Sequence, residues 1–242
     1  MSTVETKPEY PVNKYLEGSY APVPDERVVP MEKMTVVGEL PKDLTGIYVR
    51  NGPNQRYTPV SDYHRYDGDG MLHALEFKKG HVIYRNRWIR TSTFLEEEQE
   101  GHGIYQGMLG DGRNLHPEMP VKDTSNTDVV LHAGKIITMW YLSGDPYLVD
   151  PHSLETVGKF DFNGQRTTKV SAHSKTDENT DEFIFFDYSR EAPYMHSGVV
   201  DSNGDLTNFL PVELPGPRMP HDMWISSRHT ILHDLPLIWD EE

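Results

Sequence analysis

Hydrophobic residues occur along this chain in short β-rich runs that are broken by turn residues. Two such runs, Met71–Lys78 and His81–Trp88, are separated only by a Lys-Gly pair. Runs rich in β-branched and aromatic residues, with Gly, Asn, Asp or Pro between them, are typical of antiparallel strands joined by tight turns. No long amphipathic helix is indicated. The acidic stretch Glu96–Glu100 is predicted to be a solvated loop, with a cation site as the alternative. The pattern therefore predicts an all-β protein.

The middle of the chain repeats this arrangement. The expected strands are 127–132, 135–141, 146–150 and 157–162 in a first unit, 170–173, 182–188, 198–201 and 206–214 in a second, and 221–226 and 230–235 at the start of a third. Asp150 and Asp201 close equivalent third strands, 51 residues apart. Four antiparallel strands that recur every roughly 40–50 residues are the signature of β-propeller blades. A meandering β-sandwich is the alternative that this pattern leaves open.

The first thirty residues are expected to form an irregular arm. Five prolines fall within it, which rules out a helix there. The arm also carries tyrosines and aliphatic residues, so it should lie on a core. The expected organisation is an N-terminal arm over residues 1–30 and a partial β-propeller over residues 31–242.

Composition and charge exclude several classes of function. The 242 residues include 23 basic and 38 acidic ones, for a formal net charge of −15, so no basic footprint for nucleic acid is present. The absence of cysteine removes disulfides, thiolate metal sites and cysteine nucleophiles. No apolar run approaches the roughly 18–20 residues of a membrane span, and the first ten residues lack the apolar core of a secretory signal. A cytoplasmic protein is expected, with at most peripheral membrane contact, because the segment Gly107–Met119 is short and polar.

Two of the twelve histidines stand apart by position. His173 is expected to end the first strand of one unit, and His221 to open the first strand of the next, 48 residues later. Innermost strands of successive blades face a common axis, so two imidazoles there would form half of a metal site. Imidazole suits Zn, Cu, Ni and Fe, so the ligand type does not name the metal. The alternative is two unrelated histidines at strand ends. Asp222 should face away from His221 and is not expected to be a further ligand.

Other signatures of chemistry fail or are absent. An EF-hand loop that began at Asp67 would need a glutamate at its twelfth position, which is Lys78. The chain has no Gly-x-Ser-x-Gly elbow, no phosphate-binding glycine motif after a strand and no His-Glu-x-x-His pair. The histidine pair is therefore the strongest candidate site.

Several segments carry motifs that belong together. They are YLEGSYAPV at 15–23, GIYVRNGPN at 46–54, HRYDGDGMLH at 64–73, a stretch from 126 to 156, AHSK at 172–175, MPHD at 219–222 and DLP at 234–236. In this order they resemble the carotenoid cleavage oxygenase family, which includes apocarotenoid oxygenases, stilbene-cleaving dioxygenases and the retinoid isomerohydrolase. The resemblance covers nearly the whole chain.

This resemblance implies a seven-bladed β-propeller with a non-haem Fe(II) on its axis, to which this chain would contribute the N-terminal half. Four histidines and no directly bound carboxylate would hold the iron, and His173 and His221 match the first two of them. The implied reaction is cleavage by O2 of one carbon–carbon double bond in a small lipophilic conjugated substrate, giving two carbonyl products. Alone, the chain is expected to hold an incomplete iron site and to be inactive.

Two positions depart from the family pattern. Many members have a glutamate four positions before the pair Pro146-Tyr147, where it accepts a hydrogen bond from a ligand histidine. Leu142 stands at that position here and cannot accept the bond. The preceding position often holds Thr in carotenoid-type members and Lys in stilbene cleavers, and here it is Tyr141.

Tyr141 is therefore the candidate residue next to substrate or O2, although it and Leu142 would also fit as packing of the inner blade. Candidate substrate-lining residues are Tyr66, Tyr105 and Trp140. Trp140 and Tyr141 should face opposite ways on one strand unless a bulge intervenes.

Three functions stay open at this point. The first is an Fe(II)- and O2-dependent dioxygenase that acts on an apocarotenoid-like substrate. The second is a stilbene- or phenylpropanoid-cleaving dioxygenase, which the absence of Lys at position 141 disfavours. The third is a non-catalytic binding propeller or inactive fragment, because two of the implied iron ligands have no counterpart in the chain.

Overall fold

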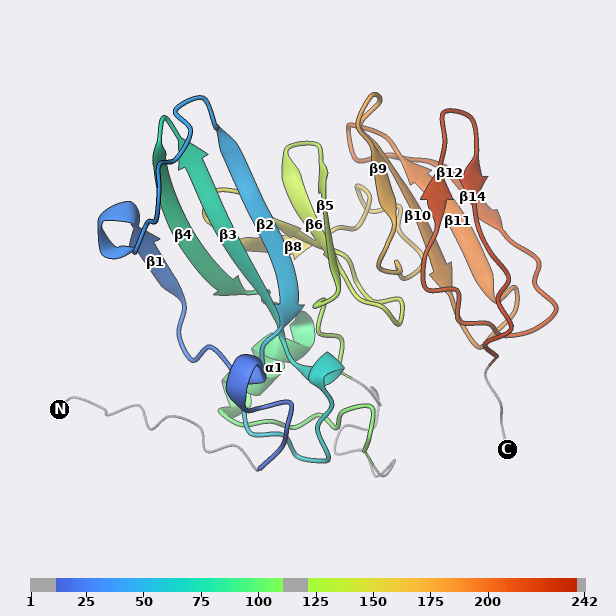
Figure 1. Cartoon of the computed structure of the whole chain (residues 1–242). Coiled ribbons are helices and arrows are strands. Elements are labelled where there is room, and N and C mark those ends of the chain that lie inside the picture. The colour runs from blue at the N-terminus through green and yellow to red at the C-terminus, as the bar shows by residue number, and fades with distance from the viewer. Residues whose placement is uncertain (1–11, 111–121, 239–242) are drawn as a thin grey trace. The chain divides into compact units, whose positions relative to one another are not determined.

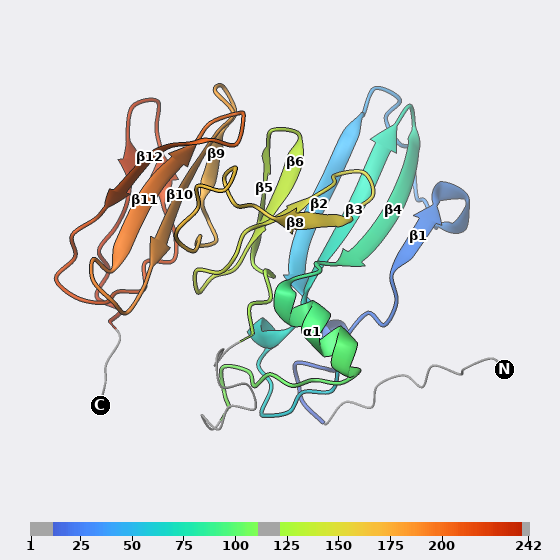
Figure 2. The same cartoon turned by 180° about the vertical axis from the view of Figure 1, so that it is seen from behind.

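The computed structural model describes residues 12–110 and 122–238, and the chain divides into two compact units, residues 1–126 and 127–242. Antiparallel sheets form the framework of both units (Figures 1 and 2). The predicted all-β class is confirmed. Residues 1–11 of the expected arm and residues 111–119 of the polar segment Gly107–Met119 lie outside the described residues.

The first unit is built on one four-stranded sheet. Its strand order is β1-β4-β3-β2, with β1 at Arg27–Pro30, β2 at Gly46–Pro53, β3 at Gly70–Lys78 and β4 at His81–Trp88. All three pairings are antiparallel. The last four residues of the expected irregular arm thus form an edge strand that pairs with β4. Three short 3-10 helices complete the unit, η1 (Gly18–Tyr20), η2 (Met31–Lys33) and η3 (Arg65–Asp67).

The acidic stretch predicted to be a solvated loop belongs instead to an α-helix, α1 (Ser92–Glu100). Thr91 caps its start by accepting a hydrogen bond from the Phe94 amide at 3.1 Å. Glu97 is only 2% exposed, and its carboxylate bonds the ammonium of Lys122. The prediction was wrong because it took every glutamate as a surface residue, whereas Glu97 faces a buried cation. Phe94 of the same helix is also buried, in a cluster with Met71 and Trp88.

The described part of the second unit contains two four-stranded sheets and one two-stranded sheet. The first sheet has the order β5-β6-β7-β8, with β5 at Asp128–His132, β6 at Lys135–Met139, β7 at Tyr147–Val149 and β8 at Thr156–Lys159. The second has the order β12-β11-β10-β9, with β9 at Lys175–Asp177, β10 at Glu182–Tyr188, β11 at Met195–Val200 and β12 at Leu206–Pro211. A two-stranded sheet follows, β13 (Trp224–Ile225) with β14 (Thr230–Ile231). These sheets match the predicted repeat of four strands.

The two sheets repeat a detail of the turn after their third strand. Asp150 follows β7, and its Oδ1 accepts the His152 amide at 3.1 Å. Asp201 follows β11, and its Oδ1 accepts the Asn203 amide at 2.9 Å. Each aspartate thus bonds the backbone two residues further on, which closes the same kind of turn in both sheets.

Two strand predictions in this unit were displaced. The strand expected over 221–226, which His221 was to open, is observed only as β13 at Trp224–Ile225. A strand was expected over 170–173, but β9 begins only at Lys175. His173 has a φ of 68°, in the left-handed region, so the chain turns there and cannot continue a pleated strand. Only isolated bridges form before it, between Val170 and Gly144 and between Ser171 and Trp140.

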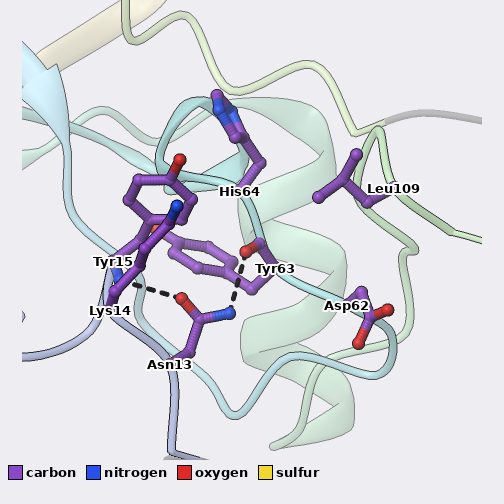
Figure 3. A pocket seen from close by; sticks show the side chains of 7 residues that line it. All are labelled: Asn13, Lys14, Tyr15, Asp62, Tyr63, His64 and Leu109. Atoms are coloured by element: carbon purple, nitrogen blue, oxygen red, sulfur yellow. Dashed lines mark hydrogen bonds between the residues drawn. The ribbon is translucent and has the colours of Figure 1, made fainter.

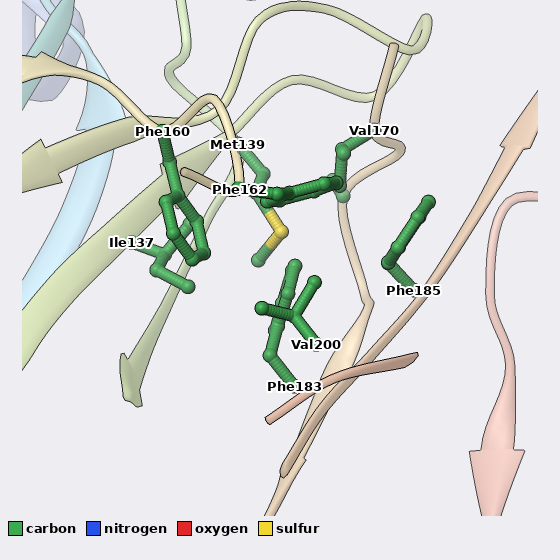
Figure 4. Packing of buried hydrophobic residues seen from close by; sticks show 9 residues of the cluster. Ile137, Met139, Phe160, Phe162, Val170, Phe183, Phe185 and Val200 are labelled. Atoms are coloured by element: carbon green, nitrogen blue, oxygen red, sulfur yellow. The ribbon is translucent and has the colours of Figure 1, made fainter. Parts of the chain in front are cut away.

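A shared core joins the two sheets of the second unit (Figure 4). Its buried members are Ile137, Met139, Phe160, Phe162, Val170, Ala172, Phe183, Phe185 and Val200. Val170 and Ala172 have no exposed surface, and they lie immediately before His173. Burial of these apolar side chains, at about 25 cal/mol per Å² removed from water, therefore anchors the segment that presents the first candidate metal ligand.

Candidate metal centre

His173 and His221 lie side by side in the second unit. Two backbone hydrogen bonds hold the chain before His173. Ser171 N donates to Phe186 O in β10 at 2.8 Å, and Ala172 N donates to Trp140 O, just past β6, at 2.9 Å. His221 lies in the coil that precedes β13. The two imidazole centroids are 5.9 Å apart and their planes meet at 88°. Residues one blade length apart in sequence are therefore neighbours in space.

Asp128, the first residue of β5, holds the ring of His173. Its Oδ2 lies 3.1 Å from Nδ1 of His173 and also accepts the backbone N–H of His173 at 3.0 Å. The hydrogen bond to Asp128 is the main cause of a raised pKa for His173, which partial burial opposes. With Nδ1 engaged by a carboxylate, Nε2 is the nitrogen left for a metal, an arrangement that metal-binding histidines commonly show.

Lys175 connects the segments that carry the two histidines. Its Nζ donates to the carbonyl of His173 at 2.6 Å and to Oδ1 of Asp222 at 2.9 Å. Burial works against ionisation of Asp222, but hydrogen bonds from Lys175 and the Met223 amide together lower its pKa. Asp222 is thus engaged by Lys175. Because His221 and Asp222 precede β13 and are not part of a strand, the expected alternation of faces does not apply to them.

The donor chemistry of this cluster fits a metal such as iron only in part. Two imidazole nitrogens suit Fe, Zn, Cu or Ni, and one of them is already oriented. Within residues 12–110 and 122–238, however, no group of three or more His, Asp or Glu side chains is arranged to hold a metal ion. The ring of His233 lies 6.2 Å from that of His221, between centroids, and its buried Nε2 has no hydrogen-bond partner among the described residues. A histidine pair alone would give an incomplete coordination sphere.

Trp140 and Tyr141 lie just past the end of β6, next to the histidine segment. Trp140 is 7% exposed, and its backbone carbonyl bonds Ala172. Tyr141 is half-buried, and its carbonyl accepts the hydroxyl of Tyr188. Because both residues lie beyond the strand, the alternation of faces expected for them does not apply, and their rings make an edge contact at 5.5 Å between centroids.

Tyr66 and Tyr105 belong to the first unit, whereas the histidine pair belongs to the second. Tyr66, in η3, is 43% exposed and its ring contacts His64 at 4.6 Å between centroids. Tyr105 is buried, and its hydroxyl donates to Glu96. Burial and this carboxylate both raise the pKa of Tyr105.

A surface pocket of about 430 Å³ lies in the first unit (Figure 3). Its lining is Asn13, Lys14, Tyr15, Asp62, Tyr63, His64 and Leu109. Asn13 fastens the arm to this place, because its Nδ2 donates to Tyr63 O at 2.9 Å and its Oδ1 accepts the Tyr15 amide at 2.8 Å. None of the predicted site residues lines this pocket.

No helix in the described part of the chain is long and apolar enough to cross a membrane. The one α-helix among those residues, α1, has nine residues and carries several glutamates.

Comparison with known proteins gives a consistent result. The profile of the family described as "RPE65: Retinal pigment epithelial membrane protein" matches residues 20–242. The carotenoid 9,10(9',10')-cleavage dioxygenase 1 of Pisum sativum is 34% identical over 243 residues, covering 92% of this chain and 44% of that protein. The isoeugenol monooxygenase of Pseudomonas nitroreducens is 32% identical over 210 residues, covering 84% of this chain and 43% of that protein. The chain thus spans less than half the length of these relatives.

Solved structures show the same architecture. The lignostilbene dioxygenase of Pseudomonas brassicacearum superposes with a TM-score of 0.85 at 25% identity, over 96% of this chain and 49% of the other. The Synechocystis apocarotenoid oxygenase superposes with a TM-score of 0.74 at 24% identity, over 86% of this chain and 46% of the other. These superpositions confirm the predicted fold class, in which this chain supplies about half of a β-propeller, and they remove the β-sandwich alternative.

Proposed function

The chain belongs to the RPE65 and carotenoid cleavage oxygenase family, and from this premise we propose that the complete protein is an Fe(II)- and O2-dependent dioxygenase. It cleaves one carbon–carbon double bond of an apocarotenoid-like conjugated substrate and releases two carbonyl products. His173 and His221 are two of its iron ligands. The relatives' names support an oxygenase, while the iron and the substrate are part of the proposal.

The neighbouring imidazoles of His173 and His221 are the observation that carries this proposal. They are 5.9 Å apart between centroids, they come from successive blade-like sheets, and the Nδ1 of one is held by a carboxylate. Such neutral donors would leave the charge of a bound Fe(II) uncompensated, and the iron, when bound, supplies the O2 chemistry. The remaining ligands would lie outside the described residues.

This chain's own residues would position the metal and shape its surroundings. The buried segment before His173 fixes where the imidazole stands, because Val170 and Ala172 are inaccessible to solvent. Tyr141 is proposed to stand next to the substrate or O2. It is half-buried, and the residue before it, Trp140, forms a bridge with Ser171 in this segment. The aromatic and aliphatic side chains around it would help to exclude water.

A phenylpropanoid-type substrate is the second candidate. The likeness to a lignostilbene dioxygenase and to an isoeugenol monooxygenase favours it. Tyr141 disfavours it, because stilbene cleavers often carry a lysine at the matching position. The phenol of a tyrosine donates a hydrogen bond but carries no positive charge at neutral pH, so it would not stabilise a phenolate substrate in the same way.

Iron content and products test these alternatives together. The complete protein, purified and loaded with Fe(II), should hold one iron per chain and should convert an apocarotenal to two carbonyl fragments under O2. Parallel incubations with a hydroxystilbene and with isoeugenol identify the preferred substrate class from the products. Equal cleavage by a metal-free preparation would contradict the iron-dependent mechanism, and substrate binding without turnover would favour a non-catalytic binding protein.

A further inference from the structure

We infer that Asp128 and Lys175 are positioning residues for the histidine pair. Asp128 sets the orientation and tautomer of His173, and Lys175 ties the segment that carries His173 to the segment that carries His221. The inference rests on the proposed function, since it concerns a metal centre built on these two histidines.

Asp128 is held in place before it touches His173. Its Oδ1 accepts the amide of the next residue, Val129, at 2.7 Å. Its backbone pairs with Met139 in the register of β5 and β6. Its Oδ2 is therefore aimed at the turn that bears His173, where it accepts both the backbone N–H at 3.0 Å and the ring at 3.1 Å. One carboxylate thus fixes the main chain and the side chain of the same residue.

This contact selects one form of the neutral imidazole. An ionised carboxylate only accepts hydrogen bonds, so the ring nitrogen that faces Asp128, Nδ1, must carry the proton. The lone pair of His173 then lies on Nε2, on the far side of the ring. The other tautomer would set two acceptors against each other across 3.1 Å. The structure therefore prepares Nε2 as the donor.

The backbone of His173 needs this support. Its φ of 68° is uncommon for a residue with a Cβ and persists only where the surroundings hold it. Its N–H bonds Asp128 and its carbonyl accepts Nζ of Lys175 at 2.6 Å, so both ends of the residue are tied. The unusual turn is what carries His173 out of the strand direction.

Lys175 then links the two histidine segments. Its ammonium bonds the carbonyl of His173 and, at 2.9 Å, Oδ1 of Asp222, the residue after His221. Asp222 Oδ1 is itself held by the Met223 amide at 2.7 Å. The side chains of Lys175 and Asp222 are 33% and 31% exposed, so this ion pair contributes little to stability. Its consequence is the fixed separation of the two segments.

The tautomer of His173 tests the role of Asp128 without any metal. In protein labelled with 15N-histidine, and above the titration midpoint of His173, NMR should show the Nδ1–H form in the wild type. Asp128→Ala should move His173 toward the Nε2–H form that free imidazole prefers, and Asp128→Asn should give a mixture. Asp161→Asn, which alters an exposed carboxylate elsewhere in the same unit, should change nothing. An unchanged tautomer in Asp128→Ala overturns the assignment.

Metal affinity tests both residues. In the complete protein, titrated with Co2+ as a spectroscopic probe, Asp128→Ala should weaken binding about 10- to 100-fold and Lys175→Met about 10-fold. Asp128→Asn should fall between wild type and Asp128→Ala. Lys135→Met is the matched control, because it removes a Lys–Asp pair of similar geometry, 3.1 Å to Asp150, outside the cluster.

The outcomes separate this inference from the proposed function. Equal Co2+ affinity in wild type, Asp128→Ala and Lys175→Met overturns the inference and leaves the proposed function standing. A wild-type protein that binds neither Co2+ nor Fe(II) contradicts the proposed function, while the NMR measurement still decides the role of Asp128. If Asp128→Ala does not fold, Asp128→Asn carries the test, because it keeps an acceptor for the His173 amide.

Discussion

In the first unit Lys122 lies between the carboxylates of Asp69 and Glu97, and in the second unit Lys175 lies between Asp222 and the carbonyl of His173. The two lysines differ in burial. The side chains of Lys122 and Asp69 are 7% and 1% exposed, whereas those of Lys175 and Asp222 are 33% and 31% exposed. Burial by itself would lower the pKa of Lys122, but the two carboxylates outweigh it and raise the pKa above its usual value.

This difference in burial separates two uses of the same chemistry. The Lys122 network ties the start of β3, the helix α1 and the chain that leads to the second unit, so breaking it would leave uncompensated charge in the interior. The Lys175 network is partly exposed to solvent beside a candidate metal centre, and an exposed ion pair adds little to the stability of the fold. The first network is therefore expected to act on stability and the second on the geometry of binding.

The largest effect is expected from Lys122→Met. It leaves Asp69 and Glu97 buried without their cation, so the free energy of unfolding should fall by about 3–5 kcal/mol. Chemical denaturation of wild type and variant measures this directly. Lys135→Met, which removes an exposed ion pair, is the control and should have almost no effect. A loss below about 1 kcal/mol for Lys122→Met would show that the buried network does not stabilise the fold.

His132 gives the next effect, because it is a buried polar group whose nearest carboxylate, Asp181, lies 3.9 Å from Nδ1 and is itself 46% exposed. It is 2% exposed, packs between Phe160 and Phe183, and neither ring nitrogen makes a hydrogen bond with a described residue. Burial lowers its pKa below 6.5. As the pH falls below that value the unfolded chain takes up a proton that the folded chain does not, so stability should fall on acidification.

The matched measurement compares wild type with His132→Leu. Unfolding free energies between about pH 8 and about pH 5 should fall less steeply in the variant. Parallel curves for the two proteins would show that His132 does not cause acid sensitivity.

A smaller effect is expected at the start of α1, the helix that brings Glu97 to Lys122. Thr91→Ala removes the hydroxyl that accepts the Phe94 amide, so the free energy of unfolding should fall by about 1 kcal/mol. Thr91→Ser keeps the acceptor and is the control for the lost methyl group. A variant as stable as wild type would mean that burial of Phe94 and Glu97 alone holds the helix.

The smallest change in stability is expected from Lys175→Met, at less than about 1 kcal/mol. The same substitution should weaken Co2+ binding about 10-fold, which is a larger effect in free energy. Denaturation and Co2+ titration of the same preparation give both quantities. A loss of stability as large as that of Lys122→Met would remove the distinction between the two networks.

Sequence patterns predicted much of the second unit. The runs 182–188 and 135–141 were expected as strands and are observed as β10 (Glu182–Tyr188) and β6 (Lys135–Met139). These predictions held because both strands are short, nearly continuous runs of β-branched or aromatic residues bounded by turn residues, a signal that acts over a few positions of the chain. The same reasoning failed at α1, where the deciding fact was the contact of Glu97 with Lys122, 25 positions away.

The candidate site was predicted in part. The spacing of His173 and His221 indicated that they would be neighbours, because it equals one blade length. Asp128 was not predicted, because the family resemblance indicated the position of Leu142 as the place of a glutamate that orients a ligand histidine. The turn of the chain at His173 also brings its ring against Asp128, the first residue of β5. No local sequence pattern predicts that contact.

The sequence by itself determined the strands, their repeat in fours and the two histidines one repeat apart, since each of these depends on periodicity along the chain. Tertiary structure decided which groups surround those histidines. Asp128 and His173 are 45 positions apart, and Lys175 and Asp222 are 47 apart. Contacts of that range arise only when two sheets pack on a common core, because packing sets which strand ends and turns face each other.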